Sequence, residues 1–233
     1  MKKQSVVYRI YPHRTIERID KKIKLLGPKY KYNVITFLNF RSIMTILVFI
    51  ICTIWVHNGY LYGPIVATIF YIMSETILLD MPIKKRTRKL EKEAIFFFEV
   101  LSLALESGRN LTSALTMTTK NINSELSMEF SSSLDELKRG RSFAEALSHL
   151  KERIPSDHIN NIIFNLVEAS TFGNNIEVSL NNQLDFLRDK ELLEIKSEIG
   201  KLPTKISIIS VIFFIPIILL VILSPVIINF ITK

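Results

Sequence analysis

The side chains that could carry out chemistry are few in this 233-residue sequence and stand far apart. The four histidines, His13, His57, His149 and His158, are scattered, and the closest two do not share a helical face. The single cysteine, Cys52, lies in an apolar run, which excludes a disulfide or a thiolate cluster within one chain. None of the common phosphate-loop, dinucleotide, zinc-protease or serine-hydrolase motifs occurs. We therefore expect no catalytic residue, no metal site and no cofactor, and a protein that is not an enzyme.

A second set of candidates lies inside long apolar runs. Glu75 is the one acidic residue of its run, and an ionisable side chain within a membrane is a functional candidate by default. It also lies about one turn from the end of that run, where it could instead extend to the interface. Pro216 and Pro225 remove backbone hydrogen bonds from another run and would allow it to bend. These three residues are the candidate intramembrane functional residues.

Three apolar runs are long enough to cross a membrane. The sequence combines 30 Lys and Arg residues with a mean hydropathy of +0.27, so apolar and charged residues must lie in separate segments. The runs cover residues 37–56, 60–79 and 206–230, and each approaches or exceeds the ~20 residues that a spanning helix needs. Only a short turn separates the first two runs, which therefore form a helical hairpin.

The basic residues indicate how these runs are oriented. Residues 1–35 hold ten Lys and Arg against Glu17 and Asp20, and the stretch KKRTRK follows the second run at residues 84–89. The loop between the first two runs has no Lys or Arg. The positive-inside rule therefore places the N-terminus and residues 82–205 in the cytoplasm and the C-terminus outside.

The basic N-terminal arm has two possible partners. Tyrosines among its basic residues could stack on nucleic-acid bases, but attraction to anionic lipid headgroups is the better-supported interpretation. Ile16, Ile19, Ile23 and Leu26 recur at helical spacing, which predicts a short amphipathic helix lying on the membrane. We expect the lipid membrane, and no nucleic acid, to be the partner of this arm.

Residues 84–205 form an insert whose charges balance, with 18 basic and 18 acidic residues. Apolar residues recur at helical spacing throughout it, and no stretch alternates with the period of a strand. One short pattern occurs three times, as SGRNLTSAL, RGRSFAEAL and FGNNIEVSL, around Gly108, Gly140 and Gly173. Glycine suits the left-handed position after a helix, and the Asn or Ser that follows suits the N-cap of the next helix. The insert is therefore predicted to be a six-helix bundle of three glycine-capped αα-hairpins.

Several stretches of the insert and the run that follows it resemble a known family. They are SGRNLTSAL with LKRGRSFAEALSHL, then LVEASTFGNNIEVSLNNQLDFLRDKE, then KLPTKISIISVIFFIPIILLVILSP. Together they resemble the type II secretion system F domain over about residues 84–230. A single such domain, with two spans before it and one after, is similar to TadB and TadC, the platform proteins of Tad (Flp) pilus machines.

The resemblance implies a non-enzymatic platform protein in the inner membrane of a bacterial or archaeal cell. Such a protein couples a cytoplasmic hexameric secretion ATPase to pilin assembly or protein export. Its implied partners are that ATPase, a second platform protein (a copy or a paralogue), and pilin or pseudopilin subunits. A membrane-anchored adaptor or receptor whose bundle binds cytoplasmic signalling partners would share the topology and stays open as the alternative.

Two features of the insert are candidate partner contacts. Lys138, Arg139 and Arg141 form a basic cluster beside the middle glycine and could face the ATPase. The other interpretation is a solvated turn, whose cations interact favourably with the C-terminus of the preceding helix. Where the family often has an acidic residue three positions before its last glycine, this chain has Ser170, and Glu168 stands two residues earlier.

The whole sequence predicts an all-α membrane protein with three transmembrane helices. A cytoplasmic six-helix bundle lies between the second and the third of these helices. The parts are a basic cytoplasmic arm (1–35), a transmembrane hairpin (36–80), a cytoplasmic F-like helical domain (84–205) and a third transmembrane helix (206–231).

Overall fold

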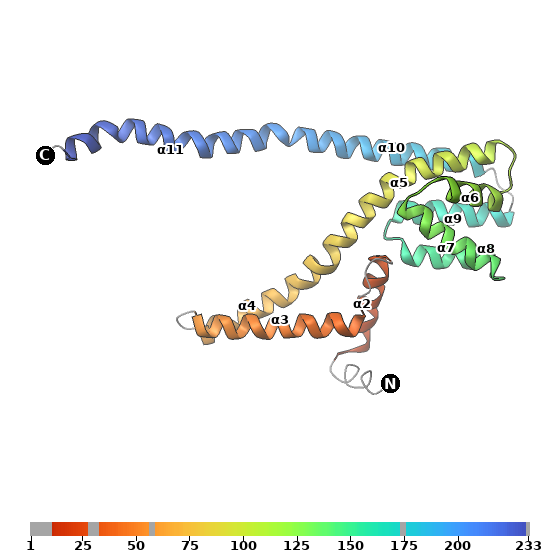
Figure 1. The fold of residues 1–233 in the computed structure, drawn as a ribbon, viewed down its shortest axis with the longest axis horizontal. Helices are drawn as coiled ribbons and strands as arrows, with labels where there is room; N and C mark the ends of the chain where they lie inside the picture. Colours follow the sequence, from red (N-terminus) through yellow and green to blue (C-terminus); the bar gives the residue numbers. More distant parts are fainter. Residues whose placement is uncertain (1–10, 28–32, 56–58, 173–175, 232–233) are drawn as a thin grey trace. The chain divides into compact units, whose positions relative to one another are not determined.

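The computed structural model describes residues 11–27, 33–55, 59–172 and 176–231, and every regular element in these ranges is a helix (Figure 1). The chain forms two compact units, residues 1–184 and residues 185–233, whose boundary falls inside α10. The elements are α2 (His13–Leu25), α3 (Val34–Trp55), α4 (Gly59–Glu75), the π-helix η1 (Thr76–Asp80), α5 (Met81–Glu106), α6 (Leu111–Asn121), α7 (Glu125–Lys138), α8 (Phe143–Arg153), α9 (Asp157–Phe172), α10 (Ile176–Gly200) and α11 (Leu202–Ile231).

Helices α3 and α4 form the hairpin that the sequence predicts. They lie side by side (Figure 1), and Gly63 allows a close approach, because a Cβ atom there would stand 3.2 Å from the Phe49 ring. Most large apolar side chains of the two helices are exposed, as expected for surfaces that face lipid. The hairpin thus supplies the first span and the start of the second.

The second span continues into the insert without a break. α4, η1 and α5 follow one another directly, and Asp80 and Met81, at the η1–α5 junction, both have right-handed helical dihedral angles. Directly after η1, the Met81 N–H donates to the Thr76 carbonyl, five residues back. This wide turn lies directly before Pro82, which lacks an N–H and crowds the preceding turn of a regular helix. We call residues 59–106 the rod.

The helical domain packs around the second half of α5. Phe97 and Phe98 are fully buried and enclose Phe130 of α7, with ring centroids 4.7 Å and 6.0 Å from it. The apolar spacing of the sequence predicts this core, because its members recur on one face of each helix. Other fully or nearly fully buried members are Leu90, Ala94, Leu101, Leu115, Leu126, Leu147, Leu150, Ile159, Ile163, Leu166, Leu180 and Leu184.

Two of the three repeated glycines stand directly after helix C-caps. Gly108, after α5, has φ of 80°, and Gly140, after α7, has φ of 94°. These are left-handed conformations that glycine adopts with little strain. Gly173 lies outside the described residues. The predicted N-caps are confirmed at Asn110, whose Oδ1 accepts from the Ser113 N–H, and at Ser142, which forms a capping box.

The second unit consists of the rest of α10 and α11. Helix α11 contains Pro216 and Pro225, and its large apolar side chains from Ile206 to Leu223 are exposed. It carries the most apolar of the three candidate spans. Over the described residues, the prediction of an all-α protein with three long apolar candidate membrane spans is therefore confirmed.

Candidate functional site

The N-terminal helix α2 packs on the ends of the two spans of the hairpin. Its fully buried residue Ile19 and the adjoining Leu26 meet Phe37 and Leu38 of α3 and Leu79 of η1. The prediction of an amphipathic helix is confirmed. The prediction that its apolar face lies on the membrane is wrong. That face is covered by protein, because the ends of the spans offer it apolar surface. The partly buried residues that complete this cluster are Tyr11, Ile16, Ile23, Val34, Ile35 and Ile83.

Ionic contacts around Glu75 hold α2 against both spans. Glu75 accepts from Lys22 at 2.9 Å, from Arg18 at 3.1 Å and from Arg41 of α3 at 3.3 Å. The Arg41 side chain, only 4% exposed, also donates to the Tyr71 carbonyl at 2.7 Å and lies over the Tyr71 ring. Glu75 is therefore a structural counter-charge that joins three helices, which we call the Glu75 cluster.

A second charged site lies where the rod enters the helical domain. The buried Arg86 guanidinium donates to Glu125 and Glu129 of α7, at 2.7 Å each. It also donates to the carbonyl groups of Leu25 at 2.8 Å and Arg153 at 2.6 Å. These carbonyls belong to the last residues of α2 and α8, where no intrahelical partner exists and a cation is favourable. One side chain thus connects four elements, and we call this set of groups the Arg86 joint.

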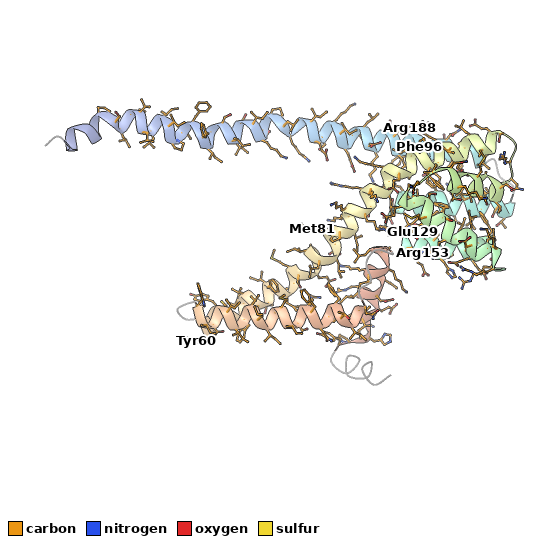
Figure 2. The ribbon with its side chains drawn as sticks, viewed as in Figure 1. Tyr60, Met81, Phe96, Glu129, Arg153 and Arg188 are labelled. Atoms are coloured by element: carbon orange, nitrogen blue, oxygen red, sulfur yellow. The ribbon has the colours of Figure 1, made fainter. Side chains whose placement is uncertain are left out.

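Arg153 extends the Arg86 joint along α7. Its guanidinium donates to Glu129 at 3.1 Å, to Ser133 at 3.0 Å and to Glu136 at 3.3 Å. Glu136 also pairs with Arg141 and His149. Figure 2 shows Glu129 and Arg153 together in the helical domain. Each carboxylate of this row has a cationic partner, so the row adds little net charge to the interior.

The Arg86 joint requires a glycine beside it. Gly27 stands directly after the C-cap of α2 and has φ of 84°, a conformation that residues with a side chain rarely adopt. A Cβ atom there would stand 2.7 Å from the Arg86 guanidinium carbon, closer than two such atoms can lie. Gly27 therefore allows the chain to leave α2 directly beside the charge that binds its last carbonyl.

The neighbouring cations change the acidity of two carboxyl groups in this row. Burial by itself would raise the pKa of Glu125, but hydrogen bonds from Arg86 and Lys89 outweigh it, and the pKa lies below its ordinary value. The hydrogen bond from His149, with those from Arg141 and Arg153, lowers the pKa of Glu136 to about 2. Both groups are therefore ionised at neutral pH and act as ion-pair partners, not as acids or bases.

The other residues singled out in the sequence occupy separate places. Lys138 is exposed and pairs with Asp135, Arg139 is exposed, and Arg141 is held by Glu136. Glu168 is half-buried in α9. No group of three His, Cys, Asp or Glu side chains in the described part of the chain could hold a metal ion. The structure thus brings Glu75 into a cluster and leaves the basic turn apart from it.

Sequence reasoning missed the Arg86 joint. Arg86 stands in KKRTRK, a stretch interpreted only as a topology signal. A signal was present in α7, where Glu129 and Ser133 share the face of Leu126 and Phe130, so two polar residues interrupt the apolar stripe. A carboxylate at such a position needs a buried cation as partner.

Comparison with known proteins identifies the family to which the helical domain belongs. Residues 97–224, more than half of the chain, match the model of "Type II secretion system (T2SS), protein F". No curated protein and no solved structure matches the chain. The match begins in the domain core and ends in α11, so Glu125, Glu129 and Arg153 lie inside it and Arg86 lies before it. The chain therefore belongs to the type II secretion system protein F family of non-enzymatic membrane platform proteins in secretion and pilus machinery.

Proposed function

We propose that this chain is the platform of a Tad (Flp) pilus-type machine and couples a cytoplasmic hexameric ATPase to pilin assembly or protein export. The observation that carries the proposal is the continuity of the rod from the second span into the helical domain. A helix that passes from membrane to domain without a flexible linker can convey a displacement along its axis. The family membership supports a role in such a machine.

The proposed arrangement places the N-terminus and the helical domain in the cytoplasm and the C-terminus outside. The excess of Lys and Arg in residues 1–35 and in the stretch 84–89 supports this orientation. The parts are the N-terminal arm (1–35), the hairpin (36–80), the F-like domain (84–205) and the third span (206–231). Within the domain, the left-handed glycines after α5 and α7 support a bundle of three glycine-capped αα-hairpins.

The two charged sites give the proposed coupling its mechanism. The Glu75 cluster fixes α2 to the hairpin, and the Arg86 joint fixes the end of α2 to α5, α7 and α8. A force applied to the helical domain would therefore reach the hairpin by two routes, the rod and α2. Ion pairs between buried side chains resist rearrangement, because breaking such a pair leaves an uncompensated charge in the interior.

The basic turn after α7 is the proposed ATPase contact. Lys138 and Arg139 are exposed there, whereas Arg141 is bound to Glu136 and contributes to the fold. The test is charge reversal of the exposed pair, Lys138→Glu with Arg139→Glu, with Lys120→Glu on the exposed surface of α6 as control. Loss of ATPase binding in the pair variant alone supports this surface. Undiminished binding would remove it from the proposal.

The proposed function as a whole is tested by what the protein binds in its own membrane. The tagged full-length chain is purified in mild detergent and its partners are identified by mass spectrometry. A secretion-type ATPase, a second platform protein (a copy or a paralogue) and pilin or pseudopilin subunits are expected. Recovery of signalling proteins without any ATPase would contradict the proposal and would instead indicate a membrane-anchored adaptor or receptor.

A further inference from the structure

The stretch KKRTRK divides into two faces with different surroundings. Arg86, Thr87 and Lys89 face the protein: Arg86 forms its joint, Thr87 contacts the Pro155 carbonyl and Lys89 pairs with Glu125. Lys84, Lys85 and Arg88 are exposed. The side chains of these three residues form no hydrogen bond or ion pair with any described residue. We call them the basic collar.

The basic collar stands where the exposed surface of the rod changes character. Just before it, the exposed side chains are apolar: Ile77, Leu78 and Met81 are 48%, 41% and 61% exposed. Met81, labelled in Figure 2, is the last of them before the collar. Lys84 follows about 4.5 Å further along the helix axis and Arg88 about 10 Å, at ~1.5 Å per residue. The surface therefore passes from hydrocarbon-like to cationic within one turn.

This distance matches the layer of lipid headgroups. The polar region adds about 5–8 Å to each side of a hydrocarbon core of ~30 Å. Lys and Arg side chains extend several ångströms beyond their backbone, so all three cations of the collar can reach that layer. An unpaired cation at this depth is complementary to a phosphate group and costs little to desolvate there.

We propose that the basic collar is a binding surface for anionic phospholipid headgroups, which hold the rod at a fixed depth in the membrane. The partner is defined by its chemistry, a phosphodiester with net negative charge at the end of two acyl chains. Three basic side chains near a membrane surface each contribute about five-fold in affinity, or about 100-fold together. The attraction weakens as salt concentration rises, because the collar is exposed.

The experiment measures how phosphatidylglycerol protects the full-length, detergent-purified protein from thermal unfolding. Phosphatidylglycerol should raise the unfolding temperature, and zwitterionic phosphatidylcholine at the same concentration should have a much smaller effect. In the variant Lys84→Gln/Lys85→Gln/Arg88→Gln, the half-maximal phosphatidylglycerol concentration should rise about 100-fold. The control Lys120→Gln/Lys138→Gln/Arg139→Gln removes three exposed cations of the helical domain and should keep the wild-type response.

Three outcomes would overturn the proposal. One is an unchanged phosphatidylglycerol response in the collar variant, and another is equal protection by the two lipids. The third is protection of the wild type by soluble polyglutamate at the same charge concentration, which would indicate an acidic protein partner instead of lipid. If the collar variant has a lower unfolding temperature even without lipid, it is compared with the wild type by its half-maximal phosphatidylglycerol concentration. This concentration reports binding separately from stability.

Discussion

Replacing Arg86 by glutamine tests whether the joint holds the helical domain to α2 and the rod. The guanidinium donates to two carboxylates and two helix-terminal carbonyls, and a glutamine side chain cannot replace these bonds. Removing one partner of a buried charge pair costs about 3–5 kcal/mol. Glu129 keeps Arg153 and Glu125 keeps Lys89, so we expect a loss of about 3 kcal/mol, at the lower end.

This loss should appear as a lower unfolding temperature. At about 2–4 °C per kcal/mol for a protein of this length, the expected decrease is about 6–12 °C, measured by circular dichroism at 222 nm in detergent. Arg88→Gln is the matched control, because Arg88 lies two residues further on and is exposed. Its cost should stay within about 0.5 kcal/mol, or less than about 2 °C.

Amide hydrogen exchange locates the effect within the structure. In Arg86→Gln, exchange should increase at the C-terminal turns of α2 and α8, whose last carbonyls lose their partner. Arg86→Lys should give an intermediate result, because one ammonium cannot match the planar fork of a guanidinium. If Arg86→Gln and Arg88→Gln melt at the same temperature, Arg86 does not stabilise this junction and the reasoning fails.

The remaining predictions concern neighbouring features. Gly27→Ala should lower the unfolding temperature by more than Gly140→Ala does, because both substitutions add strain at positive φ but only the first collides with Arg86. Thermal melts of the two variants check this, and equal decreases in unfolding temperature would contradict the collision. Ser142→Ala removes the capping box of α8 and should lower the free energy of unfolding by about 1 kcal/mol. An unchanged rate of amide hydrogen exchange in the first turn of α8 would argue against this prediction. The pKa of Glu136 is lowered to about 2 in the folded state, so its stabilising effect is complete above pH ~4.5 and is lost as the pH falls towards 2. Acid titrations of the wild type and Glu136→Gln should therefore differ in slope within that window, and parallel curves would refute the role of this ion pair.

The elements of this fold are largely readable from the sequence. The backbone polar groups of long apolar runs can be satisfied in a membrane only when the runs are helices, and apolar residues at helical spacing identify the core of the domain. The N-caps at Asn110 and Ser142 follow from local hydrogen bonding that needs no knowledge of the tertiary structure.

The contacts between elements are not readable in the same way. The pairing of Arg86 with Glu125 and Glu129 joins residues about forty positions apart, and no local pattern specifies which cation reaches which acid. For the same reason α2 was predicted to lie on the membrane: its amphipathic pattern does not reveal that Phe37 and Leu38 cover its apolar face. A run of basic residues likewise gives no sign that one of them turns inward.

Filament assembly or export in the native host, measured together with ATPase binding, tests the central claim most directly. The claim is that the Arg86 joint conveys movement from the helical domain to the membrane spans. Arg86→Gln should retain ATPase in membrane pull-downs and fold at the growth temperature, yet lose most surface pilin or exported protein relative to Lys120→Gln, a control at an exposed residue outside the joint and the collar. Wild-type assembly or export in Arg86→Gln cells, with ATPase binding intact, would contradict the claim.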